Sequence, residues 1–227
     1  MRPLVALLAL AFCSPAAAQL AITNLGHYTE NRGWNEAGLG PIYQTIVMAT
    51  VVPSGPHTLV FADNGGVPEP LVHFPQPSTP NLYVLWRRFN TDFTGAWRLR
   101  AERGDEKSAP VFSPVLAKPQ QVPLMRKVEV KRRGTQTLVN WVLPDLKGFD
   151  VDRIRVAIRG GQRLHGRFLG VLHVSGDLPP TATSFTIPPA QLVAGERYVF
   201  EVALEDLEGG ALENRSLTYS DTYTVPR

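Results

Sequence analysis

Apolar and polar residues alternate along the second half of the chain in a pattern that predicts β-strands. Residues 153–159 place three aliphatic residues between three arginines: Arg153, Ile154, Arg155, Val156, Ile158 and Arg159. Because successive side chains of a strand point to opposite faces, this pattern indicates a half-buried strand. The same alternation occurs in residues 197–205 and, more loosely, at Val128 and Val130. Three further segments predict strands: 138–143, 185–187 and 217–225.

The first half of the chain also predicts strands, in four segments: 42–52, 58–62, 82–89 and 96–102. In the last of these, Trp97, Leu99 and Ala101 alternate with charged residues. Between Asn24 and Pro41 the sequence is polar and rich in glycine and shows no apolar periodicity, which predicts a loop. Twenty prolines and nineteen glycines separate the short apolar runs, as is typical of an all-β protein.

A proline-spaced segment from Pro110 to Pro123 divides the chain. Proline lacks a backbone N–H and disfavours helix in the residue before it, so this segment predicts an extended linker. We expect two tandem immunoglobulin-like β-sandwich domains, residues 19–118 and 123–227, joined by a linker at 119–122. Each domain is long enough to bury a core of its own.

The second domain resembles the fibronectin type III family. That family places a core tryptophan three residues before a proline, as Trp141 stands before Pro144, and a leucine six residues before a tyrosine with a glycine between them, as in Leu192, Gly195 and Tyr198. The resemblance covers roughly residues 123–226, although Ala194 stands where the family often has proline. It implies a sandwich with four core residues: Trp141, Leu192, Tyr198 and Phe200. It implies no ligand, and the chain has no Arg-Gly-Asp tripeptide.

The first eighteen residues predict a secretory signal peptide. Arg2 precedes an apolar run from Leu4 to Phe12, and an Ala-rich exit follows. This run is too short to span a bilayer. Cys13 is the one cysteine of the chain and lies inside the removed segment, so the mature protein is expected to be free of disulfides. The bulky residue before Cys13 argues against lipid attachment there. We expect a periplasmic or secreted protein.

Charge is unevenly distributed in the second domain. Residues 126–167 hold eleven Lys or Arg and four Asp or Glu, whereas residues 168–227 hold three Lys or Arg and eight Asp or Glu. One interpretation is an anion-binding basic face formed by these residues: Arg126, Lys127, Lys131, Arg132, Arg133, Arg153, Arg155 and Arg159. The other is a cross-strand ladder, because the third and sixth strands of a fibronectin-like sandwich are neighbours and would pair the last three arginines with Glu201 and Glu205. The net charge of +3 indicates no nucleic-acid partner.

The best candidate for a ligand-binding surface is the predicted loop, with His27, Tyr28 and Trp34. Aromatic rings beside amides and glycines can stack on a sugar or peptide, although the same rings can instead cap the end of a sandwich. The five histidines show no metal-ligand spacing, and no cysteine survives processing, so we expect neither a metal site nor a cofactor. No catalytic motif is present, although a site assembled from distant strands stays open.

These observations favour an exported, non-enzymatic binding protein of the cell envelope, with a glycan or a protein as its ligand. The first domain would recognise the ligand, and the second would act as a spacer or docking module. An alternative is a structural or assembly component of an envelope complex that docks through exposed strand edges. A hydrolase with an unrecognised site is a third. The sequence leaves the oligomeric state open.

Overall fold

The computed structural model describes residues 19–33, 42–53, 55–76, 79–88, 94–164 and 167–227, with the side chains of 161–170 left aside. Strands form nearly all of its regular structure, and one short 3-10 helix, η1, spans Pro189–Gln191. The predicted all-β class, with two tandem immunoglobulin-like sandwiches of which the second is fibronectin type III-like, is confirmed. The predicted signal peptide, residues 1–18, lies outside the described residues.

The first module packs two layers of strands around an apolar core. One layer holds β1 (Ala21–Arg32), β2 (Ile42–Val52), β5 (Val72–His73) and β6 (Leu82–Arg88). The other holds β3 (Leu59–Asp63), β4 (Glu69–Pro70), β7 (Arg98–Arg103), β8 (Glu106–Lys107) and β9 (Val111–Phe112). Trp97 and Leu99 are buried between the layers with Val47 and Val60, so the alternation read at 96–102 does mark a core face.

The second module has the strand order of a fibronectin type III sandwich. A three-stranded sheet, β10 (Lys127–Arg133), β11 (Gln136–Val142) and β14 (Ser184–Ile187), faces β12 (Arg153–Leu164), β13 (Arg167–Val174), β15 (Arg197–Glu208), β16 (Ala211–Tyr219) and β17 (Tyr223–Thr224). Trp141, Tyr198 and Phe200 are buried in the core between the sheets, as predicted. Leu192 packs against that core but is only partly buried, because it follows η1 at the edge of the sandwich.

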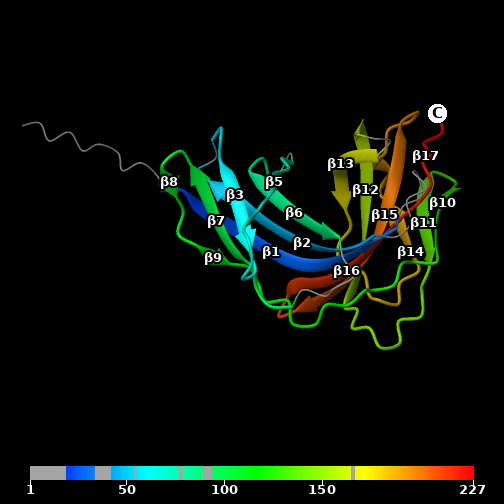
Figure 1. Cartoon of the computed structure of the whole chain (residues 1–227). Helices are drawn as coiled ribbons and strands as arrows, with labels where there is room; N and C mark the ends of the chain where they lie inside the picture. The colour runs from blue at the N-terminus through cyan, green and yellow to red at the C-terminus, as the bar shows by residue number, and fades with distance from the viewer. Residues whose placement is uncertain (1–18, 34–41, 54, 77–78, 89–93, 165–166) are drawn as a thin grey trace, which may run out of the picture.

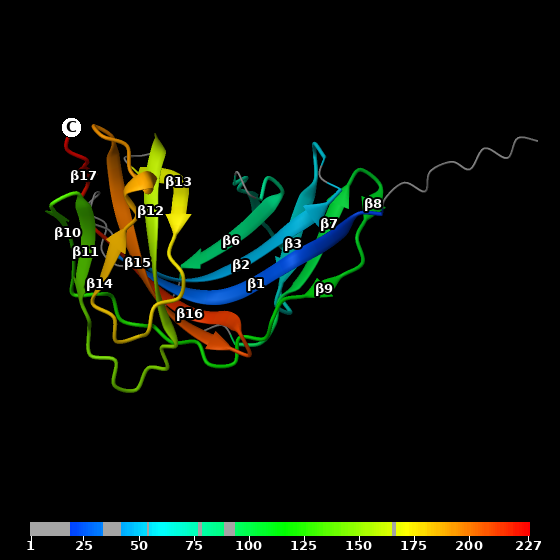
Figure 2. The same cartoon turned by 180° about the vertical axis from the view of Figure 1, so that it is seen from behind.

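One sheet runs through both modules. Strand β16 of the second module pairs in parallel with the C-terminal half of β1, from Thr29↔Asn214 to Arg32↔Leu217. This pairing joins the strands into a nine-stranded sheet ordered β13-β12-β15-β16-β1-β2-β6-β5, with β17 beside β15. In Figures 1 and 2, β1 and β2 curve from the first module toward the second, where β16 lies below them. The two modules are therefore connected by hydrogen-bonded strands as well as by the linker.

The interpretation of residues 24–41 as a loop is wrong for residues 24–32, which belong to β1. All five side chains from His27 to Asn31 are buried, so both faces of this strand are covered and polar residues occupy both. A strand of this kind has no apolar alternation to read from the sequence. Trp34 and the rest of the segment to Pro41 lie outside the described residues.

The single strand predicted at 217–225 is also wrong, because β16 begins at Ala211 and ends at Tyr219. At Ser220 the side chain takes part in the backbone pairing: its Oγ accepts the N–H of Phe200 at 3.0 Å and donates to the carbonyl of Asp221 at 2.8 Å. This local bond interrupts the strand before β17. Strand β13 escaped prediction because its apolar residues do not alternate.

Candidate functional site

Where the modules meet, one face of the shared sheet carries a cluster of ionic and phenolic side chains. We call it the charged junction; its members are Tyr28, Glu30, Arg32, Arg159, Glu201, Arg215 and Tyr219. Strand geometry explains why they meet. Tyr28, Glu30 and Arg32 share one face of β1, and the register sets Glu30 opposite Arg215 of β16. The next strands, β15 and β12, add Glu201 and Arg159 on the same side.

Glu30 is the centre of the charged junction and is fully buried. Arg32 lies 2.7 Å from one of its oxygens and Arg215 lies 2.5 Å from the other, while Gln44 donates a hydrogen bond at 2.9 Å. Burial alone would raise the pKa of Glu30, but the charges of Arg215 and Arg32 outweigh it and lower the pKa from 4.5 to about 2. Glu30 is therefore a permanent anion at neutral pH.

Tyr28 links this charge to an apolar cluster. Its hydroxyl accepts a hydrogen bond from Arg215 at 2.9 Å, and the guanidinium carbon lies 4.6 Å from the centre of its ring. Burial raises the pKa of Tyr28, so the phenol stays neutral and can serve as a hydrogen-bonding group. The ring also packs with Ile46 and Val84, which continue the same face into the first module. Tyr28 is thus a structural residue of the junction.

His27 faces the opposite side of β1. Its Nδ1 lies 3.2 Å from the carbonyl oxygen of Pro114, and its ring meets that of Trp97 edge to face. Burial lowers the pKa of His27, so the neutral ring is favoured and Nδ1 is the donor to Pro114. The structure thus separates His27 and Tyr28 onto two buried faces. The expected exposed surface built from both is wrong, and ligand binding by Trp34 stays a prediction.

The three arginines in the first part of β12 are each paired with a carboxylate. The ion pairs are Arg153 with Glu205 (2.6 Å), Arg159 with Glu201 (2.7 Å) and Arg155 with Asp177 (2.9 Å). The predicted cross-strand pairing with Glu201 and Glu205 is confirmed. The five cations of residues 126–133 lie on the other sheet, and in both sheets the core residues point inward, so the two groups of cations are on opposite sides of the sandwich. A single basic face formed by both groups is therefore wrong.

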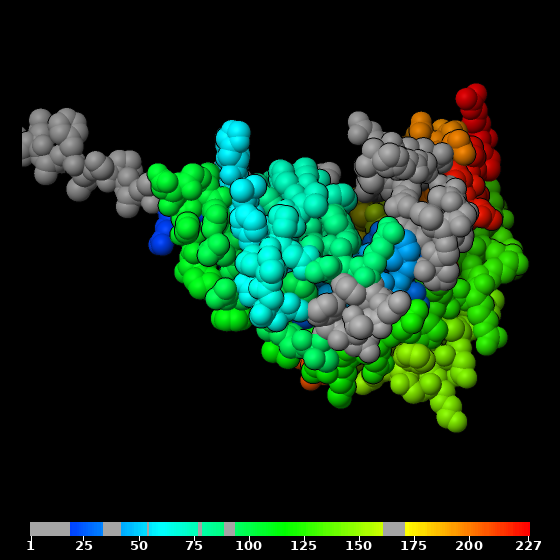
Figure 3. Space-filling model, viewed as in Figure 1, coloured from blue at the N-terminus to red at the C-terminus, as the bar shows by residue number. Residues whose placement is uncertain are grey.

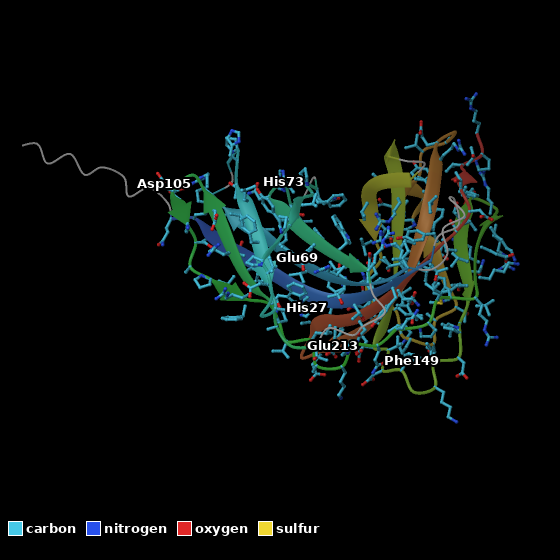
Figure 4. The ribbon with its side chains drawn as sticks, in the orientation of Figure 1. His27, Glu69, His73, Asp105, Phe149 and Glu213 are labelled. Atoms are coloured by element: carbon cyan, nitrogen blue, oxygen red, sulfur yellow. The ribbon has the colours of Figure 1, made fainter. Side chains whose placement is uncertain are left out.

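The linker and the residues that flank it, 117–123, are bound to the face of the shared sheet opposite the charged junction. Buried Asn214 accepts the N–H of Gln120 at 2.8 Å and donates to the carbonyl of Lys118 at 2.9 Å, while Glu213 accepts the N–H of Ala117 and of Lys118. Three further side chains bind its backbone: Thr29 to Gln120, Asn31 to Val122 and Ser216 to Pro123. Figure 4 labels Glu213 at the lower margin of the sheet, where this segment runs. The linker is a fixed part of the junction.

A hollow in the surface borders this junction. It has a volume of about 530 Å³ and is lined by Gly33, by Leu124–Lys131 and by Thr218–Tyr223. We call it the β10 groove, because β10 forms one wall and the segment between β16 and β17 forms the other. Strands β10 and β17 lie side by side in both ribbon views (Figures 1 and 2), and their residues meet at the right margin of the space-filling view (Figure 3).

Sequence reasoning did not find Glu30, Arg32 or Arg215 as interacting residues. A signal was present, because Tyr28, Glu30 and Arg32 recur with the period of two that marks one face of a strand. The parallel partner β16 lies about 185 residues away in the sequence, and no local pattern indicates it. Within the described residues, no group of three or more His, Cys, Asp or Glu could hold a metal ion, and no helix is long and apolar enough to cross a membrane.

Comparison with protein families gives no match, and no curated protein matches the chain. Similar solved structures include the FN1–FN3 domains of chicken CNTN1, at 11% identity and a TM-score of 0.35, covering 88% of this chain and 65% of that one. The selenomethionine-substituted chicken interferon gamma receptor alpha chain is similar at 13% identity and a TM-score of 0.30, and the match covers 89% of this chain and 97% of that one. This chain thus spans less than two thirds of the CNTN1 chain. The strand order of the structure itself identifies the second module as a fibronectin type III-like sandwich.

Proposed function

We propose that this chain is an exported, non-enzymatic binding protein of the cell envelope. The observation that carries the proposal is the rigid connection between its modules. A parallel strand pair, a buried carboxylate held by two arginines and a hydrogen-bonded linker all join the two modules. Such a connection fixes the β10 groove and the surfaces beside it in one geometry, which lowers the entropy cost of binding a partner.

The β10 groove supports a binding role better than a catalytic one. Its charged side chains are Arg126, Asp221 and the two lysines Lys127 and Lys131, which both pair with Glu129. The hydroxyls of Thr218 and Ser220 bond to backbone groups, and burial raises the pKa of Tyr219, so this phenol stays neutral. Catalysis would instead require a nucleophile activated by a matched base. An exposed cationic groove of this size is suited to recognising a ligand through charge and backbone contacts.

The test is capture of envelope material by the immobilised mature chain, residues 19–227, with both glycans and proteins identified. Lys131→Glu reverses a charge in the β10 groove, and Lys147→Glu makes the same change at an exposed site in a loop of the second module. We expect a defined ligand that the wild type and Lys147→Glu retain and that Lys131→Glu loses. Equal retention by all three proteins, or retention of nothing, would contradict the proposal.

A second candidate function is assembly through an open sheet edge. Strand β13 ends the nine-stranded sheet and exposes three aliphatic side chains: Val171, Leu172 and Val174. Unprotected apolar edges favour pairing with another strand, as an assembly component requires. In this case, Lys131→Glu would leave a complex with an envelope protein intact, whereas Val171→Lys would dissociate it. Size-exclusion chromatography with light scattering would measure the mass of the complex.

A further inference from the structure

Strand β10 has one paired edge and one open edge. It pairs with β11 from Lys127↔Val142 to Arg133↔Gln136, and within the described part of the chain it pairs with no other strand. Its other edge borders the β10 groove. The edge residues are thus placed to offer backbone groups to whatever enters the groove.

The register identifies which backbone groups are open. Arg133 and Gln136 flank a two-residue turn, so they form a hydrogen-bonded pair of the hairpin. Hydrogen-bonded and non-hydrogen-bonded pairs alternate along an antiparallel ladder. Lys131, Glu129 and Lys127 therefore direct their N–H and C=O groups toward β11. The residues between them, Val128 and Val130 within the groove, direct theirs to the open edge.

On the opposite wall of the groove, part of the backbone is already paired with β15 of the sandwich. The N–H of Ser220 donates to the carbonyl of Phe200 at 2.9 Å, and the N–H of Val225, just beyond the groove, donates to Glu196 at 2.9 Å. The hydroxyl of Thr218 accepts the N–H of Met125 at 2.9 Å, which closes the groove at the linker end. This wall can contact the side chains of an added strand, while β10 supplies the hydrogen bonds.

The charge of β10 indicates the chemistry of the occupant. Residues 126–133 contain five Lys or Arg and one Glu, and Lys127 and Lys131 are 63% and 64% exposed. Glu129 lies between these two lysines and forms ion pairs with both, which leaves an excess of positive charge along the strand. At about 3.3 Å per residue, the seven residues of β10 span about 23 Å. An acidic extended segment of similar length complements this edge.

We propose that the β10 groove binds an acidic, extended peptide segment of a partner protein, which adds a strand to the open edge of β10. This inference rests on the proposed binding function and names the ligand class and the site. Backbone hydrogen bonds to Val128 and Val130 would supply affinity, and the lysines would select acidic side chains.

The test measures binding of three synthetic peptides to the mature chain by isothermal titration calorimetry. The parent probe is a blocked seven-residue peptide of alternating Glu and Val. Two derivatives carry N-methyl groups on alternate amides. In the first derivative the amides of residues 2, 4 and 6 are methylated, and in the second those of residues 3, 5 and 7. Because only one edge of an added strand faces β10, we expect one derivative to lose at least about tenfold in affinity and the other to stay within about threefold of the parent.

Three results would overturn strand addition. They are no binding of the parent peptide at about 1 mM, equal affinities of the two derivatives, or equal displacement of a fluorescently labelled parent peptide by dextran sulfate and by the unlabelled parent. The last would indicate a general polyanion site, since dextran sulfate has no backbone amide. If these results occurred while envelope capture still depended on Lys131, strand addition would be wrong and the proposed function would stand.

Amide hydrogen exchange locates the peptide. We expect the N–H groups of Val128 and Val130 to exchange at least about tenfold more slowly when the peptide is bound, because free edge amides become hydrogen-bonded. The amides of Glu129 and Lys131 are already paired with β11 and should change little. Equal slowing of all four amides, or slowing confined to another strand, would place the peptide elsewhere and overturn the assignment.

Discussion

Glu30 shows how one residue can hold two modules together. A buried carboxylate is unfavourable unless it is paired and hydrogen-bonded, and Glu30 has both an arginine from its own strand and Arg215 from the other module. Arg32 and Arg215 keep 22% of their side chains exposed, so they reach solvent while Glu30 does not. The pairing therefore stabilises the junction only when the modules are in place.

Replacing Glu30 with glutamine should destabilise the protein by about 3 kcal/mol at pH 7, because two arginines lose their buried counter-charge. The folded pKa of Glu30, about 2, lies below its ordinary value of 4.5, so its stabilisation is complete above pH 4.5 and is lost as the pH falls toward 2. Urea unfolding should therefore show the difference between wild type and variant shrinking over that range. Glu208→Gln, at an exposed position, is the matched control; an equal effect there would contradict the role of Glu30.

His27 should add a pH dependence at higher pH. Its folded pKa lies below the ordinary value of 6.5, so the unfolded chain takes up a proton first as the pH falls. Stability from the neutral ring is present above pH 6.5 and is lost progressively below it. We expect His27→Gln to flatten the stability profile between pH 7 and about 5. An unchanged slope in the variant would show that His27 does not titrate in this way.

A substitution at Trp141 tests the core of the second module. Its ring is buried, and its Nε1 donates to the carbonyl of Ala182 at 2.7 Å. Trp141→Ala removes this packing and should cost about 3–5 kcal/mol, measured as the free energy of unfolding in urea. Val142→Ala, next to it but exposed, should cost much less. Melting of the tryptophan variant close to that of wild type would remove the basis of the fibronectin type III resemblance.

At the scale of elements, the linker depends on the side chains of β16. Asn214 is fully buried and bonds the linker backbone on both of its amide atoms, and its Nδ2 also donates to Asp206 at 2.7 Å. Prolines in the linker remove backbone donors, so these side chains supply bonds that a strand would otherwise provide. The linker is consequently ordered without belonging to a sheet.

Asn214→Asp is the sharpest test of this arrangement, because it keeps the shape and replaces the amide donor with an acceptor. The new oxygen would face the carboxylate of Asp206 and the carbonyl of Lys118, so we expect a loss of about 2–4 kcal/mol in stability. A protease of broad specificity, such as proteinase K, should also cleave the linker faster in the variant than in the wild type, because the linker backbone is less firmly held. Asn140→Asp, which keeps the same chemistry on a different strand, should leave this cleavage unchanged.

Sequence patterns predicted the elements whose two faces differ in polarity. The strand at 153–159 and the core positions Trp141, Tyr198 and Phe200 were predicted because apolar side chains alternate with polar ones. Strand β1 could not be found this way, because His27, Glu30 and their neighbours are polar and buried on both faces. Their burial depends on partners from β16, and pairing between distant segments leaves no local trace in a single sequence.

For the candidate site, the sequence identified cations but not their arrangement. The basic run of β10 and the arginines of β12 were considered as one surface, and the structure divides them between two sheets. Which backbone edge is open depends on which strands are neighbours, so the β10 groove could not be predicted from residue types. Tyr28 was selected for its aromatic ring, and it acts instead as a buried partner of Arg215.

At the scale of the molecule, the shared sheet changes how the two modules behave. Tandem sandwiches joined only by a linker reorient freely, whereas a strand pair across the junction makes reorientation require the breaking of hydrogen bonds and the exposure of Glu30. The β10 groove, which is bounded by the end of β1, the linker and the end of β16, keeps its shape only if this junction is intact.

Native-state amide hydrogen exchange of Asn31 and Gly33 in the mature chain tests this central claim most directly. The N–H of Gly33 donates to the carbonyl of Leu217 at 2.9 Å. Because alternate residues of β1 face its two neighbours, the N–H of Asn31 is also directed to β16, whereas Glu30 and Arg32 direct theirs to β2. We predict that the amides of Asn31 and Gly33 exchange as slowly as those of the core strand β15, through unfolding of the whole molecule. Fast exchange at Asn31 and Gly33 while both module cores stay protected would show that the modules are not joined by a continuous sheet, and would contradict the account.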